Sequence, residues 1–434
     1  MLKIYAVPAL MLLPFCSFGQ KDTSENLLED VTISATRFAE KTSRIAQQVH
    51  SITAKKITDA NQSTTADLLI NSGAVFVQKS QFGGGSPVIR GFEANKVLMV
   101  IDGIRMNNAI YRGGHLQNIL TIDNSILQKA EILFGPSSVM YGSDALGGVM
   151  SFYTKNPVFS NSGKTVINGN AYSRYTSAAN EKTAHADFNI GGQKFASLTS
   201  ITFSDFDDLR QGSNYYDDYP QWGKRTFYVE RINGIDSMVK NSNPQKQRFS
   251  GYQQYDLLQK FAFATGRLNH VINLQFSTSS DIPRYDRLTE TTGAGIAKFA
   301  EWYYGPQERL LAAWQFNLPA SKIYDQSQVS LSYQNIGESR HNRNYRSNRI
   351  SHRKERVNVY AVNADFKKNF TKDELGYGIE LLFNKVDSKA SFENIATGET
   401  GETDTRYPAD GTNTEIYSLY GSLIHKFSKN FTAN

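Results

Sequence analysis

The sequence has a single cysteine, Cys16, among its 434 residues. This cysteine lies in an N-terminal apolar run, Ile4 to Phe18, which follows Lys3 and ends at Gly19. A basic residue, a short apolar run and a small residue are typical of a secretory signal peptide, so we predict cleavage between Gly19 and Gln20. The mature chain would then contain no cysteine, which excludes disulfides and thiolate metal sites and suits an exported protein.

Long apolar runs are also missing after Phe18, and the mean hydropathy is −0.44. A membrane protein is still allowed, because the strands of a membrane β-barrel alternate lipid-facing and lumen-facing residues and are half polar. Aromatic residues make up 12% of the chain, with 23 Tyr and 26 Phe, more than an ordinary soluble domain needs. Aromatic belts at the two membrane interfaces would explain the excess.

Enzyme signatures are absent as well. The seven histidines do not have metal-ligand spacing, and there is no Gly-x-Ser-x-Gly nucleophile elbow. The glycine-rich stretches Gly83 to Ser86 and Phe134 to Val149 lack the Gly-Lys-Ser/Thr ending of a phosphate-binding loop. We therefore predict that the protein is not an enzyme.

The most informative segment runs from Pro87 to Gly148, and includes PVIRGFEANKVLMVIDGIRMNN and AEILFGPSSVMYGSDALGGVMSF. It resembles the plug domain of TonB-dependent outer-membrane receptors. That resemblance implies a 22-stranded antiparallel outer-membrane β-barrel with an N-terminal α/β plug in its lumen. The positions that match the plug motif are Arg90, Gly91, Asp102, Gly103, Gly135, Tyr141, Gly142, Gly147 and Gly148.

An alternating segment precedes the plug and favours an extended strand with no partner in the sequence. It resembles the TonB box, which adds a strand to a TonB-type energy transducer, a contact that needs only backbone groups and alternating side chains. The residues expected to make this contact are Asp30, Val31, Thr32, Ile33, Ser34 and Ala35.

Two further predictions concern the plug itself. The stretch Ile57 to Asn71 favours one helix, capped by Thr64 or Thr65. The charges of Arg90, Glu93, Asp102 and Arg105 are expected to pack against the polar inner wall of the barrel.

The segment GFEANKVLMVIDGIRMNNAIYRGGHLQN most resembles the haem and haemoglobin receptor branch of the family. In that reading His115 ligates haem iron beside Tyr111 and Arg112, and haem is a transported ligand rather than a resident cofactor. The barrel segments Phe-Arg-Ala-Pro and Asn-Pro-Asn-Leu of that branch are missing, and His115 is alternatively a polar residue of a plug loop. A ferric-siderophore or cobalamin receptor, or a surface adhesin without transport, are the other functions considered.

From about Val166 the pattern predicts about ten strands, each near the length that crosses a bilayer at a tilt. Short and long connectors alternate between them, as the periplasmic turns and outer loops of outer-membrane barrels do. The predicted strands are Val166 to Ser177, Thr183 to Ile190, Phe195 to Phe206, Tyr252 to Ala264, Val271 to Thr278, Arg309 to Leu318, Gln326 to Ile336, Arg356 to Phe366, Gly376 to Val386 and Glu415 to Phe427.

The long connectors carry the other expected contacts. Tyr215, Tyr216 and Trp302 offer aromatic surface for an iron-bearing ligand or its carrier protein. Ser339 to Arg356 carries seven Lys or Arg residues against one Glu, and suits lipopolysaccharide phosphates or an anionic chelate. Charge without a recognised fold is weak evidence for nucleic-acid binding, and we predict none.

We therefore expect a signal peptide (1–19), an extension with the TonB box (20–37), a plug (38–157) and a partial barrel (158–434) in the outer membrane. Ten strands form too narrow a barrel to hold a plug of this size, because barrel diameter grows with strand number. The sequence is thus expected to be an N-terminal portion of a longer receptor.

This expectation predicts the intact mass of the native protein from outer membranes. Mass spectrometry should give a value well above the 48.6 kDa of this chain. A mass just below 48.6 kDa, with only the signal peptide removed, would contradict it.

Overall fold

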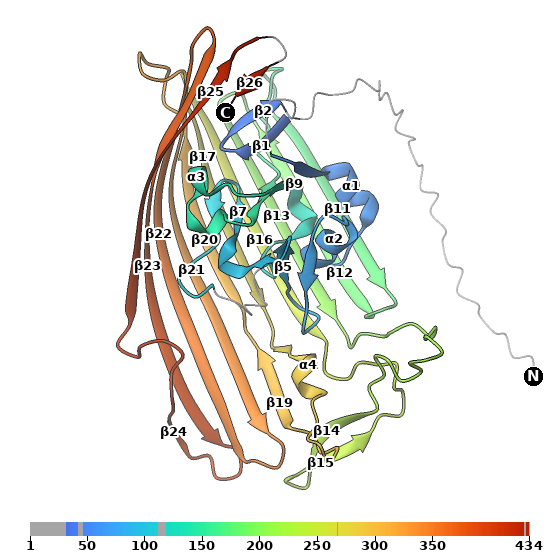
Figure 1. Cartoon of the computed structure of the whole chain (residues 1–434). Coiled ribbons are helices and arrows are strands. Elements are labelled where there is room, and N and C mark those ends of the chain that lie inside the picture. The colour runs from blue at the N-terminus through green and yellow to red at the C-terminus, as the bar shows by residue number, and fades with distance from the viewer. Residues whose placement is uncertain (1–31, 42–46, 112–118, 267, 429–430, 434) are drawn as a thin grey trace, which may run out of the picture.

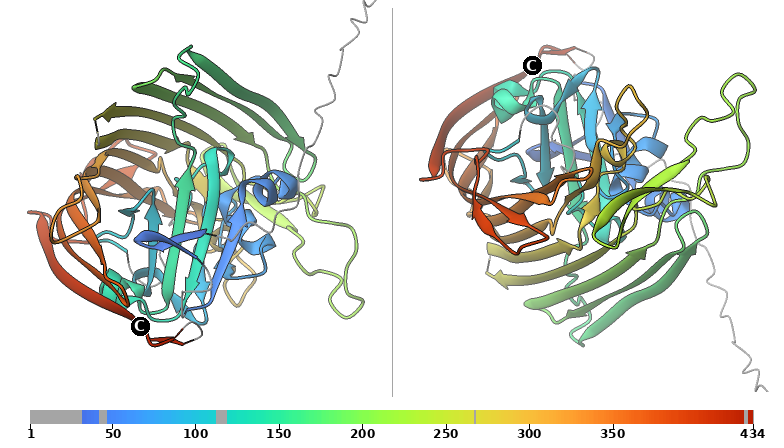
Figure 2. Two further views of the ribbon diagram at one scale, coloured as in Figure 1. Left: turned by 90° about the horizontal axis from the view of Figure 1, so that it is seen from above. Right: turned by 90° about the horizontal axis from the view of Figure 1, so that it is seen from below.

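The computed structural model describes residues 32–41, 47–111, 119–266, 268–428 and 431–433. Of these, residues up to Thr154 form a small mixed domain, and those from Val166 form a long antiparallel sheet that curves around one side of that domain (Figures 1 and 2). The predicted combination of an N-terminal α/β plug and an antiparallel barrel sheet is confirmed. In the described part of the chain, no helix is long and apolar enough to cross a membrane.

The plug is built on a five-stranded sheet in the order β3-β9-β10-β7-β8. β7 and β10 are parallel and the other pairs are antiparallel. All five residues of β7 are buried, as its uninterrupted apolar sequence VLMVI requires. The plug strands are β3 (Val49–Thr53), β4 (Phe76–Gln78), β5 (Ser86–Ile89), β6 (Phe92–Glu93), β7 (Val97–Ile101), β8 (Ile104–Arg105), β9 (Leu127–Phe134) and β10 (Gly148–Thr154).

Two of the three α-helices that the structure describes in the plug lie where one was expected, and the third is the short α3 (Ser138–Tyr141). α1 (Ala54–Ala60) ends at Asn61, whose φ of 45° is left-handed, and α2 (Thr65–Asn71) begins after Thr64. The Thr64 side chain accepts from the backbone N–H of Asp67, so the predicted cap is present. The left-handed Asn61 ends α1, and Thr64 caps a new helix three residues later, so the predicted helix is divided in two.

The ten expected barrel strands all form and pair in sequence order, and only the short β26 (Thr432–Ala433) follows them. Short turns join them at one end, here called the short-turn end, and long connections at the other, the long-loop end. The N-terminal hairpin of β1 (Thr32–Thr36) and β2 (Phe38–Lys41) lies at the short-turn end, at the top of Figure 1. The ten are β11 (Val166–Thr176), β12 (Glu181–Gly191), β13 (Phe195–Phe206), β16 (Tyr252–Thr265), β17 (Leu268–Ser279), β20 (Glu308–Phe316), β21 (Gln326–Asn344), β22 (Arg349–Asn369), β23 (Asp373–Asn394) and β25 (Thr412–Lys426).

The long connections are more ordered than their sequences indicate. Most of the basic segment 339–356, expected to be a loop, belongs to β21 and β22, which stay paired up to Arg343 and Ile350. Beyond the membrane a strand has no lipid to face, so its sequence no longer alternates. The remaining elements at this end are β14 (Phe227–Ile232), β15 (Ile235–Lys240), β18 (Ile282–Pro283), α4 (Tyr285–Leu288), β19 (Phe299–Tyr304) and β24 (Thr400–Glu402).

Two rows of aromatic rings mark the outer face of the barrel sheet. Tyr333 contacts Tyr360 in the row nearer the long-loop end, and Phe366 contacts Tyr377 in the other row. Tyr360 and Phe366 are six residues apart on β22, or roughly 20 Å at about 3.3 Å per residue. This spacing is near the roughly 25 Å of the apolar band of an outer-membrane barrel, so the rows are the aromatic girdles that the composition predicted.

An arginine placed between the girdles should destabilise the barrel. Leu331 lies on the outer face, 39% exposed and directly opposite Val362. Leu331→Arg is expected to cost about 2–4 kcal/mol in lipid, read as the free energy of unfolding in bilayers. The control Tyr216→Arg, in a long connection where the side chain is 78% exposed, should be nearly neutral. Equal effects of the two substitutions would contradict the assigned membrane band.

Candidate functional site

The candidate site is the contact surface between the plug and the inner wall of the barrel sheet. Two of the plug-motif pairs form the tight turns that shape the plug side of it. Asp102 and Gly103 join β7 to β8, and Arg90 and Gly91 join β5 to β6. All four have positive φ, from 49° to 87°, as a two-residue type I′ hairpin turn requires. The motif glycines are therefore needed at turns that a larger residue would strain.

Asp102 is the centre of the first anchor between plug and barrel. Its carboxylate accepts hydrogen bonds from the backbone and hydroxyl of Thr154, both at 2.8 Å. It also accepts from Asn273 at 2.9 Å and Gln275 at 3.1 Å, and lies 3.1 Å from the ammonium of Lys260. Three barrel side chains on β16 and β17 thus converge on one plug carboxylate, which keeps this buried charge solvated by protein.

Arg105 is the second anchor. Its guanidinium makes a two-pronged contact with Glu380 on β23, with Nε to Oε1 at 3.0 Å and Nη2 to Oε2 at 2.8 Å. It also donates to Asp144 and to the carbonyl of Tyr141 inside the plug. Burial opposes the charge of Arg105, but Glu380 and Asp144 outweigh this effect and raise its pKa above the usual value. Burial raises the pKa of Asp144, and the nearby Arg105 only partly offsets it.

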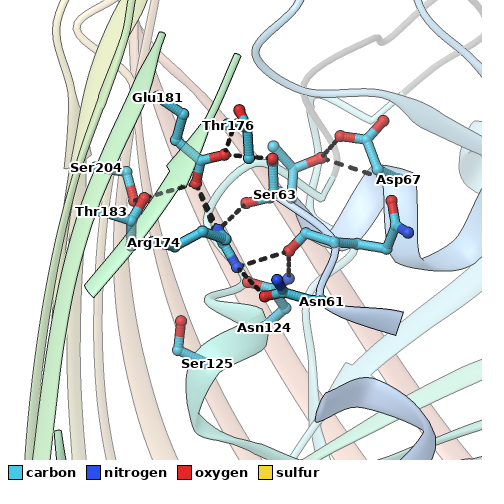
Figure 3. Close-up of polar contacts among 12 residues, drawn as sticks. Asn61, Ser63, Asp67, Asn124, Ser125, Arg174, Thr176, Glu181, Thr183 and Ser204 are labelled. Carbon is cyan, nitrogen blue, oxygen red and sulfur yellow. Dashed lines mark hydrogen bonds and ion pairs between the residues drawn. The ribbon is translucent and has the colours of Figure 1, made fainter. Parts of the chain in front are cut away.

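The third anchor holds the loop between α1 and α2 (Figure 3). Arg174 of β11 donates to the backbone carbonyls of Gln62 and Ser63, and its Nε lies 2.7 Å from Oε1 of Glu181 on β12. Ser63 donates to the other oxygen of Glu181 at 2.5 Å, and Asn124 of the plug donates to the carbonyl of Gln62. The Arg174–Glu181 ion pair of the barrel wall thus binds the plug loop, Arg174 through two backbone carbonyls and Glu181 through the hydroxyl of Ser63.

The N-terminal hairpin is anchored at the short-turn end. Arg37 lies 3.6 Å from Asp365 of β22 and donates to the carbonyl of Met140. Glu40 is paired with Lys367, which also lies 2.7 Å from Glu374. The hairpin is thus held to the barrel by opposite charges, one at its turn and one on β2.

The expected TonB-box segment is extended, but it has a partner. β1 pairs antiparallel with β2, and Ile33 lies opposite Glu40. Of the predicted contact residues Thr32, Ile33, Ser34 and Ala35 lie in β1, whereas Asp30 and Val31 lie outside the described residues. The segment is therefore already in the conformation that strand addition uses.

The remaining motif residues shape the plug core. A Cβ on Gly147 would lie 2.3 Å from Phe92, and one on Gly148 would lie 2.4 Å from the carbonyl of Leu133, so both sites require glycine. Tyr141 is buried under the guanidinium of Arg37, and burial raises its pKa to about 12. Gly135 and Gly142 are turn residues with φ of 92° and 77°.

The charges predicted to face the barrel wall divide into two groups. Asp102 and Arg105 do contact the barrel. Arg90 instead donates to Gln48 at 2.8 Å and lies over the ring of Phe134, both within the plug, and its side chain is exposed. The half-buried Glu93 lies at the start of a turn of 3₁₀ helix.

The predicted ligand contacts are not brought together. Tyr111 packs against the plug core, where burial raises its pKa. Trp302 is only 6% exposed and lies between the guanidiniums of Arg284 and Arg340. Tyr216 is exposed and Tyr215 half-buried in a separate connection, and Arg112 and His115 lie outside the described residues. Their role in ligand binding stays a prediction.

Sequence reasoning missed the barrel side of every anchor. Lys260, Asn273, Gln275 and Glu380 are polar residues at lumen-facing positions of predicted strands. Their alternation with apolar residues was visible, but their plug partners are up to 275 residues away in the chain.

Comparison with known proteins agrees with this architecture. Residues 41–149 match the TonB-dependent receptor plug domain. The vitamin B12 transporter BtuB of Vibrio vulnificus (strain CMCP6) is 26% identical over 290 residues, which are 66% of this chain and 40% of that protein. These two matches support the TonB-dependent receptor family for this chain.

Solved structures share the fold. The Serratia marcescens hemophore receptor HasR, in complex with HasA and heme, has a TM-score of 0.62 at 16% identity, over 88% of this chain and 50% of that one. FpvA of P. aeruginosa, bound to a pyoverdine-iron complex, has a TM-score of 0.63 at 12% identity, over 92% and 52%. The chain spans less than half of the length of the curated relative and about half of these structures. The plug match and the barrel sheet place the chain in the outer membrane.

The Arg105 anchor predicts a strong coupling between two distant residues. Glu380→Leu leaves a buried cation without its partner and should cost about 3–5 kcal/mol of stability. Adding Arg105→Met should recover part of this loss, because it removes the buried cation that lacks Glu380, and the Asp144 carboxylate that also loses its partner is less buried than that cation. Thermal or denaturant unfolding of the two single variants and the double variant measures the coupling. Losses that simply add would contradict the anchor.

Proposed function

We propose that the chain is the plug and the first part of the barrel of a TonB-dependent receptor that actively imports a metal-bearing ligand across the outer membrane. The observation that carries the proposal is the polar seating of the plug. Three anchors of charges and hydrogen bonds hold it to the barrel, beside apolar clusters such as Ile126 with Leu198 and Leu258. Polar contacts exchange readily for water as a domain shifts within a wet lumen.

The anchors also explain why import would need an energy supply. A hydrogen bond to a charged group contributes about 1.5–3 kcal/mol, and each anchor contains several of them. The free energy needed to break two or three anchors together is therefore far larger than the thermal energy. Mechanical pull on the N-terminal hairpin, which is tied to the barrel through Arg37 and Glu40, would break the contacts in sequence.

The proposed energy partner is a TonB-type transducer that pairs with the segment Asp30 to Ala35. β1 presents backbone groups in extended conformation beside β2, so a transducer strand would either replace β2 or add to the other edge of β1. Both routes require few specific side chains, which agrees with the short and loose motif.

The proposed cargo is haem, or haem taken from a carrier protein. This choice is supported by the resemblance of the segment from Gly91 to Asn118 to haem receptors and by the imidazole of His115. Cobalamin is the second candidate, because the relative found by sequence is a vitamin B12 transporter. A ferric siderophore is the third candidate, because a solved structure with this fold, FpvA, binds a pyoverdine-iron complex.

Outer-leaflet lipid is the proposed partner of the outer face. Lys354 and Lys389 lie directly opposite each other on β22 and β23, six residues beyond the girdle positions Tyr360 and Phe383. Like charges directly opposite are destabilising. A phosphate of lipopolysaccharide between them would relieve the repulsion.

Deleting residues 31–35 should separate transport from binding. Cells with the deletion are expected to bind ligand normally but to lose energy-dependent uptake, because the transducer has no strand to pair with. Uptake of labelled ligand, compared with binding to whole cells, measures the difference. Unchanged function would favour an adhesin that transports nothing.

The cargo is tested by the visible absorbance of haem bound to the purified receptor. His115→Ala should shift the Soret band, because removal of an axial imidazole changes the iron coordination. The control His425→Ala, at the short-turn end, should leave the band unchanged. A band that persists without a shift in His115→Ala would reject that residue as the ligand, and no haem binding at all would favour cobalamin or a siderophore.

A further inference from the structure

Two histidines face each other across the part of the β21–β22 hairpin that extends beyond the membrane. His341 and His352 are directly opposite partners in the ladder, and their Nδ1 atoms are 2.6 Å apart. His352 lies eight residues beyond the girdle position Tyr360, about 26 Å along the strand at roughly 3.3 Å per residue. The pair is therefore well outside the lipid, on the long-loop side.

The surroundings hold the two rings in place. The ring of Tyr303 on β19 stacks on His341, with ring centroids 4.6 Å apart and an interplanar angle of 16°. This packing leaves His341 only 5% exposed, while His352 is half-buried and open to water. Burial lowers the pKa of His352, and Lys354 acts in the same sense, whereas the carboxylates of Glu393 and Glu301 oppose this shift.

We propose that His341 and His352 bind one divalent transition-metal ion, Zn²⁺, Cu²⁺ or Ni²⁺, through their Nδ1 atoms. Imidazole nitrogen is a preferred ligand of these ions, and unperturbed histidine is mostly neutral at pH 7. Two nitrogens that each lie about 2.0–2.1 Å from one metal are roughly 3 Å apart in tetrahedral or square-planar geometry. A separation of 2.6 Å needs only a small opening of the two rings.

The protein supplies two ligands and water completes the coordination. Within the ranges that the structure describes, no group of three or more His, Cys, Asp or Glu residues could hold a metal ion, so the pair is an open site rather than a closed structural one. Bound metal would link β21 to β22 where the hairpin projects furthest from the membrane. This inference does not depend on the proposed transport function.

The test uses the full receptor purified from outer membranes, stripped with a chelator and titrated with ZnCl₂. His341→Asn and His352→Asn should each lower the zinc stoichiometry by one per chain, and zinc should raise the thermal midpoint of the wild type but not of these two variants. His425→Asn, which removes a histidine paired with Asp373 rather than with a second histidine, is the matched control and should keep the full stoichiometry.

Electron paramagnetic resonance with CuCl₂ gives a second readout. The wild type should show coupling to two equivalent nitrogens, and each single variant should lose it. His352→Asn changes the more exposed ring, so it keeps the test informative if His341→Asn fails to fold. Unchanged stoichiometry in both variants, or a wild-type signal no different from that of the double variant, would show a hydrogen-bonded pair only and would overturn the proposal.

Discussion

The structure depends on charges that neither the plug nor the barrel can bury alone. Asp102 lies in the turn between β7 and β8 and Arg105 lies on β8, whereas their partners Lys260 and Glu380 lie on strands far apart in the barrel sheet. Each charge loses its water when the two parts meet, so the parts must meet in one register for every charge to find its partner. This constraint fixes how the plug sits more strictly than apolar packing would.

The same contacts suit the proposed displacement of the plug during uptake. Separating apolar surfaces in water costs free energy in proportion to the area exposed. When an ion pair opens in a hydrated lumen, new hydrogen bonds to water offset much of the cost. Arg174 and Glu181 are an example. They bind the loop at Ser63 through separate hydrogen bonds, and water can replace these bonds one at a time. In the proposed transport cycle these contacts would hold the plug at rest and would open when energy is supplied.

Much of this fold could be predicted from the sequence, because a membrane barrel imposes a period of two on every strand. Val166–Thr176 and Phe195–Phe206 formed almost as expected for this reason. The pattern fails once a strand leaves the lipid, so the strands around His341 and Arg353 were taken for a loop. The plug turn at Asp102 was visible as a motif, but its convergence with Asn273 depends on how two separately folded parts pack, and no local pattern encodes that.

In the proposed mechanism, the plug must move relative to the barrel for uptake to occur. The most direct measurement is ligand uptake with the two parts reversibly joined, using Ser63→Cys and Thr183→Cys and a cleavable thiol cross-linker. Cys16, the only cysteine of this sequence, lies in the predicted signal peptide, so residues 20–434 would supply no thiols besides the two introduced ones. The account predicts normal binding and no uptake while the linker is intact, with uptake restored when it is cleaved. Uptake at the full rate through the linked receptor would contradict it.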